Sequence, residues 1–477
     1  MRILTRALLA VLCLLALLVA GAALLWAQAT TSTVGDLAFA NELRIPPLLE
    51  PSDGIFELEM QEGRTTWGFN GPYLGPTLRA SRGDRVEMRV RNELPESSTV
   101  HWHGMHLPAA ADGGPHQMIE PGDTWRPSWT IDQPAATLWY HPHPHGRTED
   151  HVYRGLAGMF IIDDPRERAL ALPRRYGVDD VPVIVQDVRF DDGELSESQG
   201  LISPIGRMGD EILVNGTSDP HLVVTTTRVR LRLLNASTAR IYAFGFAGER
   251  EFDLIATDGG LLAAPQRLTR VQLSPGERAE VVVEVEPGED VVLRSFEPDL
   301  GDTDAFNAHF AGGDDSFDIL ELRAGEELDA SPPVPAALVA QEAPAAAAAT
   351  EVRRFELGSR DINGLQMDMD RIDQRVPIDE TEIWEIHNRA GIPHNFHVHD
   401  TRFLVLEPKR PALGGLKDTV QVLPGETVRV VTRFSDYSDP ATPYMFHCHL
   451  LQHEDRGMMG QFVVVEPGDD AAGGHHE

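Results

Sequence analysis

The residues with the clearest chemical potential lie near the C-terminus, at positions 447–459, where the sequence reads HCHLLQHEDRGMM. Within this stretch Cys448, His453 and Met458 follow one another at intervals of five residues. Thiolate and thioether are soft ligands and imidazole is intermediate, a mixture that suits copper among the first-row metals. Two histidines, a cysteine and a weak axial methionine form a blue-copper electron-transfer site, so the stretch supplies all but one ligand of such a site.

His447 and His449 flank the cysteine and predict a second metal site. If the stretch begins on a β-strand, alternate side chains point to opposite faces, and both imidazoles lie on the face away from Cys448. The chain has only two cysteines, and the other one, Cys13, lies in an apolar N-terminal run. Cys448 is therefore expected to be free of a disulfide and available to a metal.

Two short patterns recur three times at domain-sized intervals, which indicates three copies of one module. One pattern is a Pro-Gly turn that precedes a run of β-forming residues, and the other is a β-forming run that ends in asparagine. The turns occupy residues 120–123 (EPGD), 274–277 (SPGE) and 423–426 (LPGE), and the asparagines are Asn92, Asn235 and Asn388.

Histidine pairs of the form HxH occur in the first and third modules at matching positions. Nine and eleven residues after the three asparagines stand, in chain order, His101 and His103, Phe244 and Phe246, and His397 and His399. A second pair follows in the outer modules only, as His141 and His143 and as His447 and His449. Alternation places each pair on one face of a strand. The outer modules are therefore predicted to share one polynuclear metal site, with the middle module as a spacer without metal.

Length and composition predict an all-β protein of several domains. The 477 residues suggest roughly three domains of about 150 residues each. Helical periodicity is scarce, and short β-forming runs broken by Pro and Gly are typical of antiparallel sandwiches or barrels. The formal net charge of -33 argues against nucleic acid as a partner, because phosphates would repel such a surface.

The N-terminal segment, residues 1–29, predicts export. Arg2 and Arg6 precede an apolar run over residues 7–26, and the following Ala-Gln-Ala resembles a cleavage site between small residues. The run is close to the ~20 residues needed to span a bilayer, so an uncleaved membrane anchor is the alternative to a cleaved signal. Either interpretation places the protein in the periplasm or outside the cell.

Composition also predicts where the domains begin and end. Residues 327–350 are rich in Pro and Ala and lack periodic patterning, so we expect an exposed linker there. The tail at 468–477 is expected to be disordered, with His475 and His476 as solvated residues. The expected domains are 36–165, 166–326 and 351–467.

Taken together, the motifs resemble those of the three-domain multicopper oxidases, a family that includes laccases, bacterial cuprous oxidases and bilirubin oxidases. The matching stretches are HWHG at 101–104, HPH at 141–143, HNFHVH at 394–399, the stretch at 447–459, and GPYLGPTLRASRGDRVEMRVRNEL at 71–94. The resemblance covers nearly the whole mature chain. It implies three consecutive cupredoxin-like Greek-key domains that hold four copper ions.

By position, the resemblance also implies a ligand for each copper. The type 1 ligands would be His394, Cys448, His453 and Met458, and the type 2 ligands His101 and His397. The type 3 pair would be held by His103, His141, His143, His399, His447 and His449. Met459 is the weaker axial candidate, and only the resemblance separates it from Met458. The remaining histidines near the motifs lie off the repeated positions and are expected to support ligands or face solvent; they are His106, His116, His145, His151 and His387.

The family's reaction needs protons as well as electrons. Cys448 would pass electrons to its neighbours, because its backbone leads directly to His447 and His449. Asp112 and Glu454 match acidic positions that relay protons in similar bacterial oxidases. The simpler alternatives are a turn residue before Gly113 and a solvated carboxylate, respectively.

The resemblance implies oxidation of a small reducing substrate with reduction of O2 to water, and we expect a monomer. Phenols or aromatic amines are the expected donors. Cuprous oxidases carry Met and acidic residues before the third motif, whereas this chain has AGIP at 390–393, and Met367 and Met369 are only a pair. Cuprous ion oxidation is the close alternative. Two further alternatives are less favoured: a non-catalytic copper-binding or assembly protein, and a copper nitrite reductase. The chain also departs from the family's motif at one position, where Asn395 stands in place of the usual proline.

Overall fold

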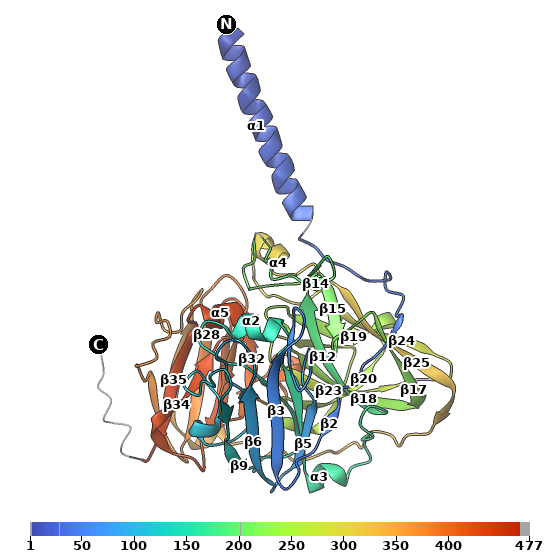
Figure 1. Cartoon of the computed structure of the whole chain (residues 1–477), viewed down its shortest axis with the longest axis vertical. Helices are drawn as coiled ribbons and strands as arrows, with labels where there is room; N and C mark the ends of the chain where they lie inside the picture. The colour runs from blue at the N-terminus through green and yellow to red at the C-terminus, as the bar shows by residue number, and fades with distance from the viewer. Residues whose placement is uncertain (1, 28, 201, 468–477) are drawn as a thin grey trace.

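The computed structural model describes residues 2–27, 29–200 and 202–467, and its body is built almost entirely of β-sheet (Figure 1). The predicted all-β class is confirmed. Three large hydrophobic cores succeed one another along the chain. The helices are α1 (Arg2–Ala27), α2 (Thr148–Tyr153), α3 (Pro165–Arg168), α4 (Ala305–Phe310) and α5 (Leu451–Asp455).

The N-terminal helix α1 projects away from the body and meets it at α4 (Figure 1). The Trp26 ring stacks on His309 of α4, with ring centroids 3.9 Å apart. Among the described residues, no helix combines the length and the hydropathy needed to cross a bilayer. The predicted disordered tail, with His475 and His476, lies outside the described residues.

The first core lies between two sheets of five strands each. In β6 the burial alternates along the strand, as expected for a strand with one face in the core. One sheet contains β4 (Trp67–Phe69), β3 (Ile55–Glu62), β6 (Arg85–Asn92), β8 (Thr124–Trp125) and β9 (Ser128–Thr130). The other contains β2 (Leu48–Leu49), β5 (Thr77–Ser81), β11 (Gly158–Asp163), β10 (Ala136–His141) and β7 (His101–His103).

The middle core lies between a seven-stranded and a six-stranded sheet, and Phe244 and Phe246 pack within it as predicted. The larger sheet runs β16 (Thr217–Ser218), β15 (Glu211–Val214), β12 (Asp180–Val188), β18 (Arg228–Asn235), β23 (Arg278–Glu284), β20 (Phe252–Thr257) and β21 (Gly260–Leu268). The smaller runs β1 (Asn41–Glu42), β17 (Pro220–Thr226), β25 (Phe317–Asp329), β24 (Asp290–Phe296), β19 (Tyr242–Phe246) and β22 (Arg270–Leu273). A separate hairpin joins β13 (Phe190–Asp191) and β14 (Glu194–Leu195).

The third core again lies between two five-stranded sheets and contains Cys448 and Met458. One sheet runs β26 (Ala349–Leu357), β28 (Thr381–Asn388), β33 (Thr427–Arg433), β30 (Phe403–Leu406) and β31 (Leu416–Lys417). The other runs β27 (Gln374–Pro377), β35 (Met459–Val465), β34 (Asp439–His447), β29 (His394–Val398) and β32 (Thr419–Val422).

The recurring asparagines and Pro-Gly turns are structurally equivalent in all three modules. Strands β6, β18 and β28 each end at the asparagine. In every module the turn glycine donates its N–H to the asparagine carbonyl, at 2.7, 2.9 and 2.8 Å for Gly122, Gly276 and Gly425. The asparagine side chain also donates to two carbonyls in each case. The sequence echoes therefore reflect one repeated strand-and-turn unit.

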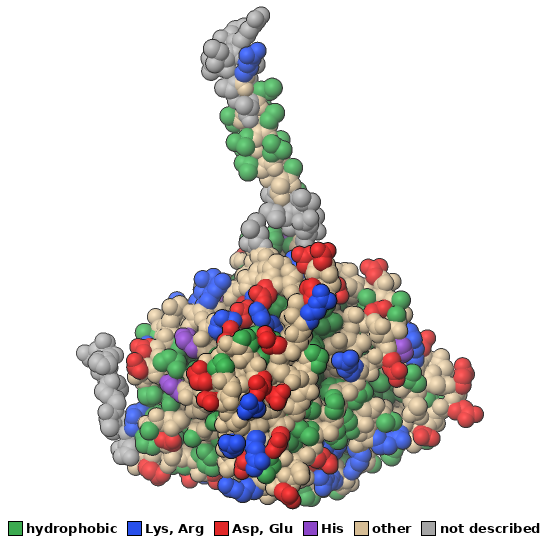
Figure 2. Space-filling model, viewed as in Figure 1, with side chains coloured by type: hydrophobic (Ala, Val, Ile, Leu, Met, Phe, Trp, Pro, Cys, Tyr) green, Lys and Arg blue, Asp and Glu red, His purple; other side chains and the backbone are tan. Residues whose placement is uncertain are grey.

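The Pro- and Ala-rich segment before the third module has no buried residue over positions 331–350, but part of it packs against the middle module. Val334, Leu338 and Val339 pack against a small apolar cluster of the middle module, and Leu338 donates its N–H to Ala263 O at 2.9 Å. A composition without periodicity does not reveal this packing. On the face shown in Figure 2, acidic side chains are spread among basic ones rather than gathered into one patch.

Candidate metal centres

A mononuclear donor set forms beside the third core. His394 begins β29, Cys448 follows β34, and His453 lies in α5. Cys448 Sγ lies 3.5 Å from His394 Nδ1 and 3.9 Å from His453 Nδ1, and the two nitrogens are 3.2 Å apart. Met458 lies in the same buried cluster as Cys448, whereas Met459 does not. The carbonyl of Met458 accepts the N–H of Cys448 at 3.1 Å, and Met458 donates its own N–H to His453 O at 2.9 Å, so the four residues expected to form the type 1 site are adjacent.

The tautomer of His453 leaves one nitrogen free for a metal. Its Nε2 lies 3.1 Å from the carbonyl oxygen of Pro204, which can only accept, so Nε2 carries the proton. Nδ1 then presents a lone pair to Cys448 and His394. Burial lowers the pKa of His453 to about 4 and raises that of the Cys448 thiol to about 12. A cation is needed to stabilise the thiolate here, as a bound copper would.

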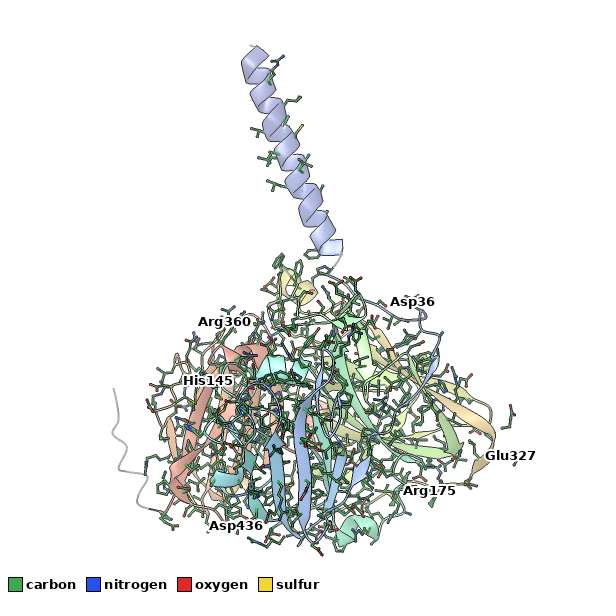
Figure 3. All side chains as sticks on the ribbon, viewed as in Figure 1. Asp36, His145, Arg175, Glu327, Arg360 and Asp436 are labelled. Carbon is green, nitrogen blue, oxygen red and sulfur yellow. The ribbon has the colours of Figure 1, made fainter. Side chains whose placement is uncertain are left out.

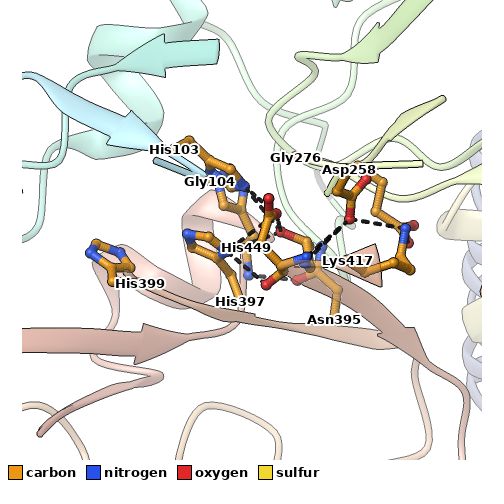
Figure 4. Close-up of polar contacts among 12 residues, drawn as sticks. His103, Gly104, Asp258, Gly276, Asn395, His397, His399, Lys417 and His449 are labelled. Carbon is orange, nitrogen blue, oxygen red and sulfur yellow. Dashed lines mark hydrogen bonds and ion pairs between the residues drawn. The ribbon is translucent and has the colours of Figure 1, made fainter. Parts of the chain in front are cut away.

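A second donor set forms where the first and third modules meet, and it has an internal symmetry. In the first module His101 pairs with His141 across β7 and β10, and in the third His397 pairs with His447 across β29 and β34. The ring of His103 stacks on His397 at 3.7 Å, and His101 stacks on His399 at 3.8 Å. All eight histidines of the predicted HxH pairs are buried. Figure 4 shows His103, His397, His399 and His449 converging from the two modules.

Six of these histidines separate into two triads. His141 Nε2 lies 3.3 Å from His103 Nδ1 and 3.4 Å from His449 Nε2. In the second triad His447 Nε2 lies 3.1 Å from His143 Nε2 and 3.2 Å from His399 Nε2. The remaining two, His101 and His397, face each other with their Nε2 atoms 3.5 Å apart. The residues 447 and 449 thus enter different triads, while Cys448 between them points to the mononuclear set.

The hydrogen bonds around the cluster fit metal ligation. His101 Nδ1 donates to Asp112 O, and His397 Nδ1 donates to Asp418 O, each at 2.9 Å. Their Nε2 atoms are then both unprotonated and face each other, an arrangement that a cation between them would satisfy. Burial also lowers the pKa of His143 to about 4 and of His449 to about 3, which keeps these imidazoles neutral and able to bind metal at neutral pH.

Two aspartates, one from each module, accept a hydrogen bond from a histidine of the other module. Asp112 of the first module accepts from Nδ1 of His399 in the third, at 2.6 Å. Asp418 of the third module accepts from Nε2 of His103 in the first, at 3.0 Å. Each aspartate also holds a histidine of its own module through its backbone carbonyl. This reciprocal arrangement fixes ring orientation on both sides of the cluster.

Sequence reasoning identified Asp112 but missed Asp418. Asp418 is fully buried and paired with Arg278 of the middle module, whose Nη1 and Nη2 lie 2.7 and 2.6 Å from the carboxylate. The available signal was the charged pair Lys417-Asp418 within an apolar β-forming run. Two opposite charges in such a run indicate a buried, paired position.

Glu454 contacts the other two histidines of the triad that includes His399, the histidine that Asp112 holds. Its Oε2 is 3.1 Å from His447 Nδ1, and its Oε1 is 3.5 Å from His143 Nδ1. Burial opposes ionisation of the carboxyl, but the facing imidazoles of His143 and His447 outweigh it and hold the pKa of Glu454 well below its usual value. Both predicted acidic residues therefore contact histidines of the cluster rather than solvent.

The other histidines near the motifs stand apart from the donor sets, as expected. His106 is paired with Asp400 and Asp436, and His151 with Glu96. His145 is exposed at the surface (Figure 3). Among the described residues, every group of three or more potential ligands lies within the two centres just described or adds Asp418 to them.

Comparisons with known proteins agree with this arrangement. Three models described as multicopper oxidase match residues 53–167, 189–292 and 330–468. The multicopper oxidase mco of Staphylococcus aureus is 34% identical over 89% of this chain and 93% of that protein. A laccase structure from Pediococcus acidilactici matches with a TM-score of 0.80 at 34% identity, over 89% of this chain and 94% of that one. The cell division protein FtsP of Dickeya dadantii is 36% identical over 89% of this chain and 92% of that protein.

This chain belongs to the multicopper oxidase family. Its three modules are cupredoxin-like domains, and the family binds copper and uses O2 with a reducing substrate. Both predictions, of the family and of the fold, are confirmed.

Proposed function

We propose that this protein oxidises a small phenol or aromatic amine by one electron at a time and reduces O2 to water. The observation that supports this most strongly is that Cys448 contacts one donor set while its chain neighbours, His447 and His449, enter the two triads of the other. Copper bound at the two centres would supply one-electron transfer and the reduction of O2. With one site for donor oxidation and another for O2 reduction, electrons taken from the donor one at a time can be used in a four-electron reduction.

The proposed ligands are those predicted from the sequence, for four copper ions. His394, Cys448, His453 and Met458 would hold type 1 copper, and His101 and His397 type 2 copper. The two triads, His103, His141 and His449 and His143, His399 and His447, would each hold one ion of the type 3 pair. Support comes from the convergence of unprotonated nitrogens within 3.5 Å in each group.

Asp112 and Glu454 are proposed to move protons toward the cluster. Each is nearly inaccessible to solvent and lies within hydrogen-bonding reach of a histidine of one triad. Asp112 Oδ1 has no hydrogen-bond partner among the described residues, which leaves it able to exchange a proton with a nearby oxygen or water. Asp112 comes from the first domain and Glu454 from the third, and both contact histidines of the triad His143, His399 and His447.

Cuprous ion oxidation is the second candidate activity. Met367 donates its backbone N–H to Gly457 O at 2.9 Å, so the segment with Met367 and Met369 lies beside the loop that carries Met458. Thioethers at that position suit Cu(I). The FtsP relatives, whose name gives a role in cell division, support a third and non-catalytic possibility.

We also propose the domain boundaries, the cellular location and the oligomeric state of the protein. The domains would span residues 36–165, 166–326 and 351–467, with the middle domain free of copper. Residues 1–29 would direct export to the periplasm or beyond, by a cleaved signal or as an anchor, and the protein would act as a monomer.

Oxygen uptake by the copper-loaded protein, with a phenolic donor and with Cu(I) in parallel assays, tests the proposal. We expect faster uptake with the phenol and none with Cys448→Ser. Fast uptake with Cu(I) and slow uptake with the phenol would establish the cuprous activity instead. No uptake with either donor, at full copper content, would favour the non-catalytic alternative.

A further inference from the structure

The turn of the middle domain, Ser274–Glu277, lies directly against the metal centres. All four residues of this middle-domain turn are buried, whereas all four residues of the equivalent turn at 120–123 are exposed. The turn at 423–426 is also partly or fully exposed. The backbone hydrogen bonds of the three turns are the same, with the fourth residue donating to the first at 2.9 to 3.0 Å. The difference is therefore one of location and not of local geometry.

On one side the turn touches the trinuclear cluster. A methyl group placed on Gly276 would lie 3.1 Å from Cγ of His449 and 3.2 Å from Cε1 of His103. These two histidines belong to the same triad and come from different domains. Figure 4 shows Gly276 beside His103 and His449. Both distances are shorter than ordinary van der Waals contacts, so a methyl group at this position would push on both rings, and glycine leaves them in place.

On its other side the turn holds the residue next to the mononuclear centre. Asn395 Nδ2 donates to Pro275 O at 2.9 Å and lies 3.2 Å from Ser274 Oγ. With its amide nitrogen held there, its Oδ1 accepts the N–H of His449 at 2.5 Å and lies 3.5 Å from Cys448 Sγ. Asn395 stands where the family usually has proline, which could make none of these side-chain contacts.

Buried charges hold the turn in place. Glu277 Oε2 accepts both the N–H and the hydroxyl of Ser274, at 2.7 and 2.8 Å. Its Oε1 lies 3.0 Å from Lys417 of the third domain. Arg278, the next residue, binds Asp418, which in turn holds His103. Glu277 and Arg278 therefore fix the turn to the third domain just after Gly276, and the contact of Pro275 with Asn395 fixes it just before.

We propose that this middle-domain turn is a positioning element for both copper centres, acting on His103 and His449 through Gly276 and on the Cys448 environment through Asn395. The inference rests on the proposed copper sites and revises the role of the middle domain, which binds no metal in the proposal but sets the geometry of ligands in the other two. The turn would thereby fix the short covalent connection at residues 447–449 relative to both sites.

The test compares Gly276→Ala with Gly122→Ala, a matched control. Both glycines have a φ of 85° and the same turn hydrogen bonds, so the backbone strain of alanine is equal. In the part of the chain that the structure describes, however, no atom lies within 4 Å of a methyl group on Gly122. Copper affinity is measured by competition with a chelator, and each copper type is followed by electron paramagnetic resonance and by absorption. We expect Gly276→Ala to bind copper at the trinuclear cluster about 10-fold more weakly, as typical for displaced ligand supports, and Gly122→Ala to match the unaltered protein.

A second variant, Asn395→Ala, tests the other half of the proposal and covers the case in which Gly276→Ala does not fold. We expect a changed copper–thiolate absorption and a shifted reduction potential, with copper retained at all sites. Equal copper affinity in the two glycine variants, or an unchanged absorption and potential in Asn395→Ala, would overturn the inference. These readouts do not depend on turnover, so a copper-binding protein without oxidase activity would refute the proposed function alone.

Discussion

The two metal centres differ in how they are assembled. The donors proposed for the mononuclear centre all come from residues 394–458, and two of them, Cys448 and Met458, belong to one hydrophobic core. The donors proposed for the trinuclear centre come from residues 101–143 and 397–449, on two domains that must dock to bring these histidines together. The donors of the first centre therefore belong to one domain, although Pro204 and Pro275 of the middle domain contact His453 and Asn395. The second centre exists only at the interface of two domains, where the reciprocal carboxylates Asp112 and Asp418 hold it.

Replacing the cysteine is expected to have the largest effect and to separate the centres. Cys448→Ser removes the soft ligand of the mononuclear centre, and a hydroxyl is a poor substitute. We expect loss of the intense visible absorption and of all turnover, while copper remains in the trinuclear cluster because His447 and His449 are unchanged. Copper content and oxygen uptake measure this. Retained oxidase activity would refute the assignment.

Asp112→Asn is expected to slow oxygen reduction by about 100-fold, the usual contribution of a positioned acid. The amide oxygen can still accept from His399, so all copper should stay bound. Single-turnover reoxidation of the reduced protein by O2 measures the rate, and the reduction of the mononuclear centre by donor should be unaffected. Loss of copper from this variant would make Asp112 a structural residue instead.

Asp418→Asn is expected to weaken the interface rather than the chemistry. It leaves the buried guanidinium of Arg278 facing an amide, and the support of His103 is weakened. We expect copper affinity at the trinuclear cluster to fall about 10-fold, with the absorption of the mononuclear centre unchanged. Competition with a chelator measures the copper affinity, and the visible absorption reports on the mononuclear centre in the same samples. An equal loss at both centres would contradict the distinction between them.

Acid is expected to have the smallest effect, and mainly on the copper-free protein. His143, His449 and His453 have pKa values lowered by burial to about 4, 3 and 4, against about 6.5 when unfolded. Between pH 4 and about 6.5 these histidines bind more protons in the unfolded chain than in the folded one. Their contribution to the free energy of unfolding is therefore fully present above pH 6.5 and falls as the pH drops toward 4. The thermal unfolding midpoint of copper-free protein should be several degrees lower at pH 5 than at pH 7. No difference would show that these imidazoles are more exposed than the structure places them.

The sequence predicted the elements and ligands that are encoded by local spacing. The positions nine and eleven residues after Asn92 and Asn388 fall on equivalent strands because the repeat unit keeps its length. It did not predict contacts made by residues distant in sequence, such as Asp418 with His103 or Gly276 with His449. The middle domain was expected to be a spacer because it lacks histidine pairs, yet its turn is the one buried against the cluster. A turn motif specifies backbone geometry and contains no information about which surface covers it.

If the two proposed centres work together, one O2 is consumed for every four molecules of a one-electron donor. The measurement is the electron balance of the copper-loaded protein, with oxygen uptake, donor oxidation and hydrogen peroxide followed in the same reaction. A ratio of one to four without peroxide is the expected result. One O2 for two donor molecules with accumulating peroxide, or donor oxidation that stops after the bound copper is reduced, would contradict the claim that residues 447–449 join two working centres.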